Sequence, residues 1–383
     1  MRLRFVLTSL LLLAISPASP QVAGQRPQLP VGKITDGKNM TTARGGHTAT
    51  FLPDFRVLIA GGIGKGGTVL RSAEIYNPTN DTFTPTGKMT IARQGHAGAV
   101  LSDSKVLIAG GATLGGTVLA SSEDYDFESG KFTARGKMHF ARVHATAVVL
   151  RDGSPLVTGG SGGNQPLDSA ETYSSLNGKW TLVGKMTTPR VGHTATLLTD
   201  GRVLIAGGFG KDGKAISSAE IFDPKTKQFT AVGNMNQARG QHGAAVIASS
   251  APISGGKAMM IGGADYHGRG DHKDGHDRGN DLSSAEMFDP ATNSFTATGN
   301  LSDSRQPLSN AFSFRDGRVV IFGGALTGEI FDPRTGAFRK VDGSFDTARQ
   351  GSAAIQLMDD SVRIFGGFDS TGASTAKTWI YRP

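Results

Sequence analysis

Cysteine is absent from the 383 residues of this chain, and proline, tryptophan and tyrosine are few, at 16, 2 and 5 residues. The lack of cysteine excludes a disulfide framework, a thiolate metal site and a cysteine nucleophile. After the first 25 residues, no apolar run approaches the roughly 18 residues of a membrane-spanning helix. No Lys/Arg block is present either, so a net charge of +8 does not indicate nucleic-acid binding.

Glycine is abundant, with 54 residues, which is roughly twice its ordinary share. Many glycines with few prolines are typical of short strands joined by tight turns, and they exclude helix bundles and coiled coils. The composition therefore predicts one large all-β architecture.

The first 24 residues have the pattern of a secretory signal peptide. Arg2 and Arg4 precede a mostly apolar stretch from Phe5 to Ile15, and small residues follow. We expect residues 1–24 to be removed and residues 25–383 to form a single propeller domain that is secreted or periplasmic and monomeric. An uncleaved membrane anchor is the alternative.

A Gly-Gly pair that follows an apolar strand recurs along the chain at intervals of 43 to 61 residues. The pairs are Gly61/Gly62, Gly110/Gly111, Gly159/Gly160, Gly207/Gly208, Gly262/Gly263, Gly323/Gly324 and Gly366/Gly367. Each copy holds four short strands, which we call a, b, c and d. A repeat near 50 residues with four strands predicts the blades of a β-propeller.

These repeats resemble the kelch motif in the double glycine, in the aromatic of strand c and in the Trp or Phe of strand d. The resemblance covers the chain from about Gly32 to its end, and it implies seven blades of four antiparallel strands. The last copy lacks strand d, whereas residues 31–40 contain the end of a strand d without a, b or c. We therefore expect this N-terminal strand to complete blade seven and to close the ring.

An Arg stands just before strand a in every copy. These residues are Arg44, Arg93, Arg142, Arg190, Arg239, Arg305 and Arg349. Because strand a is innermost in a kelch blade, we expect them around the mouth of the central channel. Six copies carry a Glu at the start of strand c, which predicts inter-blade ion pairs. Unpaired guanidiniums at the mouth would instead bind carboxylates or phosphates, and both interpretations remain open.

Histidines follow this Arg in five copies: His47, His96, His193 and His242 three residues later, and His144 two residues later. Hydrogen-bonded structural histidines account for a partial ring of this kind, and metal or proton-transfer roles are the alternative.

The b–c loop of blade five is longer than its counterparts and rich in imidazoles and carboxylates. It predicts a divalent transition-metal site formed by some of five residues, His267, Asp271, His272, His276 and Asp277. A solvated loop without metal is the alternative, because the spacing matches no known metal motif. No other cofactor is expected.

The sequence favours a binding protein over an enzyme. The partner would be a protein or an anionic glycan or peptide, held at the face that carries the arginines and the blade-five loop. The chain also resembles the propeller portion of the galactose oxidase superfamily, but that family's radical site requires a Tyr–Cys cross-link and cannot form without cysteine. A sugar epimerase or mutarotase acting on an acidic carbohydrate is the alternative function.

Overall fold

The computed structural model describes residues 28–248, 254–265, 280–305 and 310–383. Residues 1–30 form one unit and Val31–Pro383 a second, and the second contains every strand found among the described residues. The predicted signal peptide and the five predicted metal ligands lie outside the described residues. No helix among the described residues is long and apolar enough to cross a membrane.

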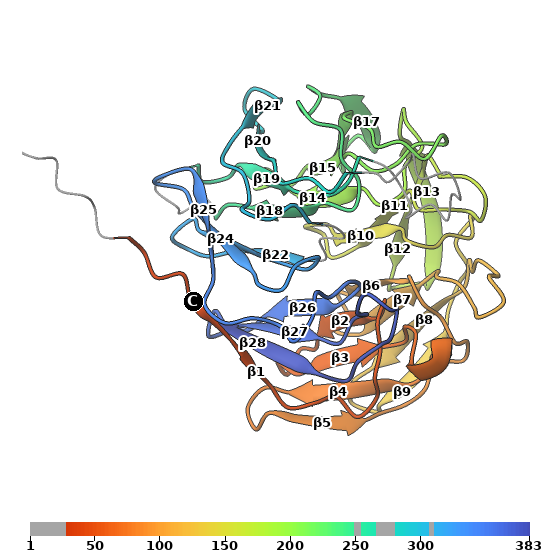
Figure 1. Ribbon diagram of the computed structural model, residues 1–383. Coiled ribbons are helices and arrows are strands. Elements are labelled where there is room, and N and C mark those ends of the chain that lie inside the picture. Colours follow the sequence, from red (N-terminus) through yellow and green to blue (C-terminus); the bar gives the residue numbers. More distant parts are fainter. Residues whose placement is uncertain (1–27, 249–253, 266–279, 306–309) are drawn as a thin grey trace, which may run out of the picture. The chain divides into compact units, whose positions relative to one another are not determined.

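The second unit consists of seven four-stranded antiparallel sheets, which are the blades of a propeller (Figure 1). The innermost strands are β2 (Thr48–Phe51), β6 (Ala97–Val100), β10 (Thr146–Val149), β14 (Thr194–Leu197), β18 (Gly243–Val246), β22 (Asn310–Ser313) and β26 (Ala353–Gln356). The second strands are β3 (Val57–Ala60), β7 (Val106–Ala109), β11 (Pro155–Thr158), β15 (Val203–Ala206), β19 (Ala258–Ile261), β23 (Val319–Phe322) and β27 (Val362–Phe365).

The third and outer strands complete each blade. The third strands are β4 (Ala73–Asn77), β8 (Ser122–Asp126), β12 (Ser169–Ser174), β16 (Ala219–Asp223), β20 (Ala285–Asp289), β24 (Glu329–Asp332) and β28 (Thr378–Arg382). The outer strands are β5 (Thr82–Pro85), β9 (Lys131–Ala134), β13 (Lys179–Lys185), β17 (Gln228–Ala231), β21 (Ser294–Ala297), β25 (Ala337–Lys340) and β1 (Lys33–Asp36). A short 3₁₀ turn, η1 (Lys65–Gly67), lies between β3 and β4.

The second strand of every blade is buried along its whole length. Both faces of such a strand pack against neighbouring blades, which explains why sequences such as Val203–Ala206 are apolar at consecutive positions rather than at alternate ones. The apolar clusters accordingly join adjacent blades, as where β3 and β4 pack on β7 and β8. The core is thus a set of inter-blade layers around the channel.

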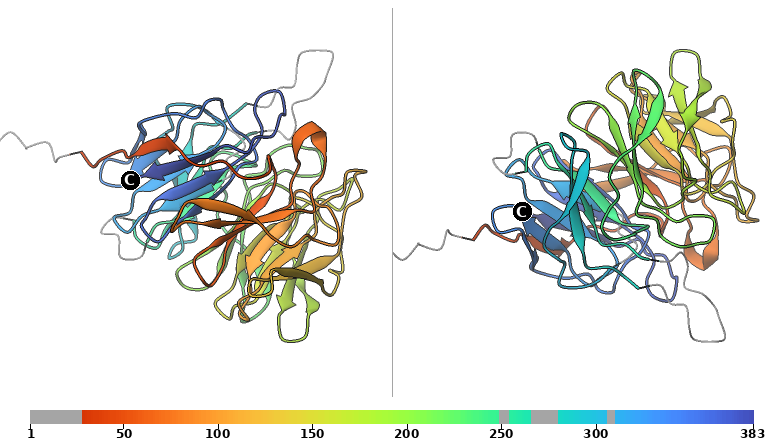
Figure 2. Two further views of the ribbon diagram at one scale, coloured as in Figure 1. Left: turned by 90° about the horizontal axis from the view of Figure 1, so that it is seen from below. Right: turned by 90° about the horizontal axis from the view of Figure 1, so that it is seen from above.

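The inner strands form a closed ring, because each contacts the inner strand of the next blade and β26 contacts β2. The last blade is completed as predicted: β1 pairs antiparallel with β28, with Ile34 opposite Tyr381. In Figures 1 and 2, β1 in red lies beside the blue strands of the C-terminal blade. The sequence prediction of a seven-bladed propeller closed by an N-terminal strand is confirmed.

Candidate functional site

The seven arginines that precede the inner strands are buried, and all but Arg349 are at most 1 % exposed. In blade four, Arg190 Nη2 donates to Glu220 Oε1 at 2.8 Å and Nη1 donates to the carbonyl of Gly207 at 2.7 Å. The same Arg–Glu pair recurs in six blades, at distances of 2.6 to 2.9 Å. In blade seven, Arg349 pairs with Asp346 at 2.8 Å.

These pairs lie within blades, which corrects the expectation that they bridge neighbouring blades. Arg190 stands directly before β14, and Glu220 lies in β16 of the same sheet. The second carboxylate oxygen of Glu220 accepts the backbone N–H of Thr187, in the connection that enters the blade. Each pair therefore fixes the start of its own blade. None of these seven arginines exposes a guanidinium to which a ligand could bind.

Burial lowers the pKa of six of these guanidiniums, in Arg44, Arg93, Arg142, Arg190, Arg239 and Arg305, while the partner Glu opposes the shift. Since the pKa of a free Arg is above 12, each of these six guanidiniums stays charged beside its Glu. Each is held in the buried contact with that Glu rather than presented to the channel.

The backbone of the same arginines joins the blades. The second glycine of each Gly-Gly pair donates its N–H to the carbonyl of the next blade's Arg, as Gly62 does to Arg93 at 2.9 Å. The series ends with Gly367 and Arg44, across the junction of blades seven and one. A Cβ on Gly61 would lie 2.7 Å from the carbonyl oxygen of Arg93, so this close approach requires glycine.

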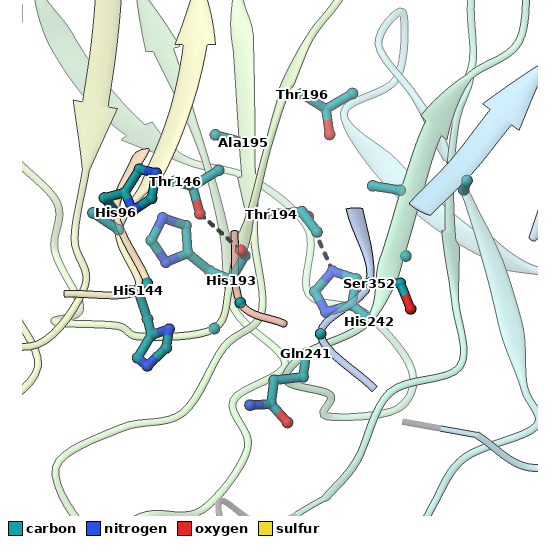
Figure 3. Close-up of a pocket in the computed structure, with 18 of the residues that line it drawn as sticks. His96, His144, Thr146, His193, Thr194, Ala195, Thr196, Gln241, His242 and Ser352 are labelled. Atoms are coloured by element: carbon teal, nitrogen blue, oxygen red, sulfur yellow. Dashed lines mark hydrogen bonds between the residues drawn. The ribbon is translucent and has the colours of Figure 1, made fainter. Parts of the chain in front are cut away.

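A cavity of about 510 Å³ occupies the channel at the ends of the inner strands. We call it the channel pocket. Its polar lining side chains include His96, His144, Thr146, His193, Thr194, Thr196, Gln241, His242 and Ser352 (Figure 3). His47 also lines it. No described residue that lines it carries a carboxylate, ammonium or guanidinium group.

Four histidines of the channel pocket, His47, His96, His193 and His242, are buried. His96 Nε2 lies 3.0 Å from Thr48 Oγ1 of the preceding blade, and His242 Nε2 lies 3.0 Å from Thr194 Oγ1 in the same way. His193 Nε2 lies 2.9 Å from Thr158 Oγ1. These three contacts agree with structural histidines that hold adjacent blades together.

Desolvation lowers the pKa of all four rings, and the neighbouring arginines lower it further. The pKa of His96 and that of His242 both fall to about 3, and those of His47 and His193 fall well below 6.5. The rings are neutral at physiological pH, so the channel pocket as a whole carries no charge from its buried histidines.

His144 is not equivalent to the other histidines, although the sequence suggested a single group. It occupies the position held by glycine in four blades, namely Gly46, Gly95, Gly192 and Gly351, and its side chain is exposed. Gln241 takes that position in blade five. The glycines have φ of 60 to 66°, and His144 and Gln241 adopt similar values of 53° and 49°. Figure 3 shows the side chains of both on one side of the channel pocket, with Thr196 on the other.

The left-handed backbone at this position serves hydrogen bonding between blades. It directs the N–H of His144 to the carbonyl of Gly95 at 2.8 Å, and that of Gln241 to the carbonyl of Gly192 at 2.7 Å. Gly46 donates to Gly351 in the same way, at 2.8 Å. Backbone hydrogen bonds between blades therefore line the mouth of the channel, and the side chains of His144 and Gln241 project from this backbone.

Two comparisons with known proteins bear on this architecture. The kelch motif matches residues 141–187 and 189–236, which span blades three and four. A fungal alcohol oxidase of the AA5 family, determined in complex with copper, superposes with a TM-score of 0.70 and 18 % identity over 92 % of this chain and 76 % of that chain. At this identity the likeness concerns the fold alone. No curated protein matches the chain in sequence.

Proposed function

We propose that this propeller is a binding protein of the kelch type whose ligand or partner docks at the channel mouth. Two blades match the kelch motif, and all seven share one architecture. Kelch propellers typically mediate protein interactions. We further propose that binding takes place on the face of the propeller where the d–a connections and the b–c loops emerge.

The observation that carries the proposal is the backbone at His144 and Gln241. Nine described non-glycine residues have positive φ, and the other seven lie in a–b or c–d turns at the opposite ends of the strands. Six of those seven residues are polar, and Asp, Asn and Ser in such turns tolerate this backbone locally; Phe55 is the exception. At the mouth, four described blades use glycine. Two blades instead retain a costly conformation together with a polar side chain, which is exposed in His144 and half-buried in Gln241, and this favours a role in binding.

An enzyme is less well supported. Acid–base catalysis of epimerisation needs positioned groups that can exchange protons with the substrate. The described lining offers no carboxylate, and its buried imidazoles have a pKa far below neutrality. The proposed export rests on the pattern of residues 1–24, and the metal site of the blade-five loop stays a prediction.

The face can be tested because the chain has no cysteine. Leu114, in a b–c loop, and Leu176, in a c–d turn, are 71 % and 97 % exposed. Wild-type protein is screened against glycans and peptides, and the Leu114→Cys and Leu176→Cys variants are then labelled with a bulky maleimide-linked polymer. We expect the label from Leu114→Cys to block binding and the label from Leu176→Cys to leave it intact. Blockade by the second label alone, or by neither, would place the binding surface elsewhere.

A further inference from the structure

Resting on the proposed function, we propose that the channel pocket binds an uncharged, hydroxyl-rich ligand of saccharide size, and that His144 and Gln241 determine its specificity. This differs from the anionic ligand that the arginines suggested in the sequence.

The charge of the described lining argues for a neutral ligand. The groups that face the cavity are hydroxyls, an amide, imidazoles and glycine backbone, and none is a charged side chain. The guanidiniums of Arg190 and Arg239, which precede two of the inner strands, are buried in ion pairs with glutamates of their own blades. An anion or cation entering the channel pocket would lose hydration without gaining a counter-charge, which is costly. A neutral polar ligand avoids that penalty.

The polar groups match a ligand that both donates and accepts hydrogen bonds. The hydroxyls of Thr146, Thr194 and Thr196 come from two adjacent inner strands. Those of Thr146 and Thr194 bond the His193 carbonyl and the His242 ring, respectively, and a hydroxyl has capacity for further hydrogen bonds. His47 lines the same cavity and is 7 % exposed, and neither of its ring nitrogens has a partner among the described residues. Phe312 adds a partly buried aromatic side chain on another blade. The volume of the channel pocket, about 510 Å³, falls within the range of about 300–1,000 Å³ that is typical of small-molecule sites.

His144 and Gln241 stand on the two blades that flank blade four. Each side chain leans over the glycine of the preceding blade: a Cβ on Gly95 would lie 2.8 Å from His144 Cε1, and a Cβ on Gly192 would lie 3.3 Å from Gln241 Cγ. Glycine at the preceding position therefore provides the space that these side chains occupy. An imidazole and a carboxamide each offer both donors and acceptors of hydrogen bonds, which suits hydroxyl recognition.

The test uses isothermal titration calorimetry with the full chain. The probes are neutral disaccharides (maltose, cellobiose and lactose), the singly charged glucuronate, galacturonate and glucosamine, and short peptides. We expect a neutral disaccharide to bind more tightly than any charged sugar or peptide. In the His144→Gly, Gln241→Gly double variant its affinity should fall at least tenfold, whereas stability should be unchanged or higher because glycine relieves the left-handed strain.

Lys227→Gly is the matched control, since Lys227 has φ of 58° in an exposed c–d turn away from the mouth. It should relieve similar strain and leave affinity unchanged. Tighter binding of an acidic sugar or a peptide, or undiminished affinity in the double variant, would overturn the inference. If the label from Leu114→Cys still blocks binding of the ligand found in that case, the proposed binding face is retained and only the inference about the channel pocket fails. If neither label blocks binding, the proposed function and the inference both fail.

Discussion

At the scale of single residues, His47 differs from His96 and His242 because the preceding blade provides no hydroxyl to bond its ring. Thr48 and Thr194 bond the rings of His96 and His242, whereas blade seven has Ala353 at that place. His47 is left with both ring nitrogens unpartnered and buried among the described residues. The junction of the first and last blades thus lacks a hydrogen bond that two other junctions have.

Restoring the hydroxyl should stabilise this junction. We expect Ala353→Thr to raise the free energy of unfolding by about 1 kcal/mol, the usual net value of a buried hydrogen bond, as measured by urea denaturation. Ala97→Thr is the control, because the next blade has Ala145 rather than histidine at the facing position. It adds the same hydroxyl without an imidazole partner and should give no gain. Equal effects of both substitutions would show that the hydroxyl acts through something other than His47.

The buried histidines also predict acid sensitivity. The pKa of His96 and that of His242 are about 3 in the folded protein and about 6.5 in the unfolded chain. Between these values the unfolded chain binds more protons, so stability is complete above pH 6.5 and falls as the pH decreases toward 3. Each ring should contribute up to about 1.4 kcal/mol per pH unit. Urea titrations between pH 7 and 4.5 should show a shallower slope for His96→Gln than for wild type, and an identical slope would contradict this assignment.

At the scale of strands and turns, the Gly-Gly pair has two separable requirements, a left-handed backbone and space. Gly61 has φ of 65° and faces the Arg93 carbonyl, whereas Gly66 has φ of 68° and no atom within 4 Å of its missing Cβ. Gly66→Ala should cost about 1–2 kcal/mol from backbone strain alone. Gly61→Ala should cost at least about 2 kcal/mol more, since the Cβ would displace the bonded carbonyl. Thermal unfolding of both variants would measure the difference, and equal losses would mean that the close approach is not required.

The fold could be predicted because its determinants repeat. A Gly-Gly pair follows the second strand of each blade. The outer strand that is missing after the last copy at the C-terminus matched the strand without partners near the N-terminus. The partners of the arginines could not be fixed in the same way. Each Glu, such as Glu74, lies in the sequence between the Arg of its own blade and that of the next, and only the sheet shows that the pair closes within the blade.

The channel pocket was harder to predict than the propeller. An offset of one residue separates His144 from the position of His96, yet it changes the ring from buried to exposed. The cause is a positive φ at this position. A glycine in the sequence indicates such an angle, whereas a His or Gln that adopts it gives no such indication. Comparing the blades position by position could have revealed His144 and Gln241 as departures from a glycine position.

At the scale of the whole molecule, each blade is hydrogen-bonded to both neighbours, including blade seven to blade one through Gly367 and Arg44. Losing one blade would expose the flanking inter-blade surfaces, so we expect the ring to unfold in one transition rather than blade by blade. The chain's two tryptophans report on different parts of the ring, Trp180 in β13 of blade three and Trp379 in β28 of blade seven.

Trp180→Phe and Trp379→Phe each leave one reporter, whose fluorescence can be compared with the circular dichroism of the same variant during denaturation. We expect the two signals to coincide in both variants, because β1 ties the last blade into the ring. Removing residues 1–37 deletes β1 and leaves the edge of β28 unpaired. In that background the Trp379 signal should change at lower denaturant than the Trp180 signal. A Trp379 transition that already precedes the other in the full chain would show that blade seven opens independently and that β1 does not make the ring cooperative.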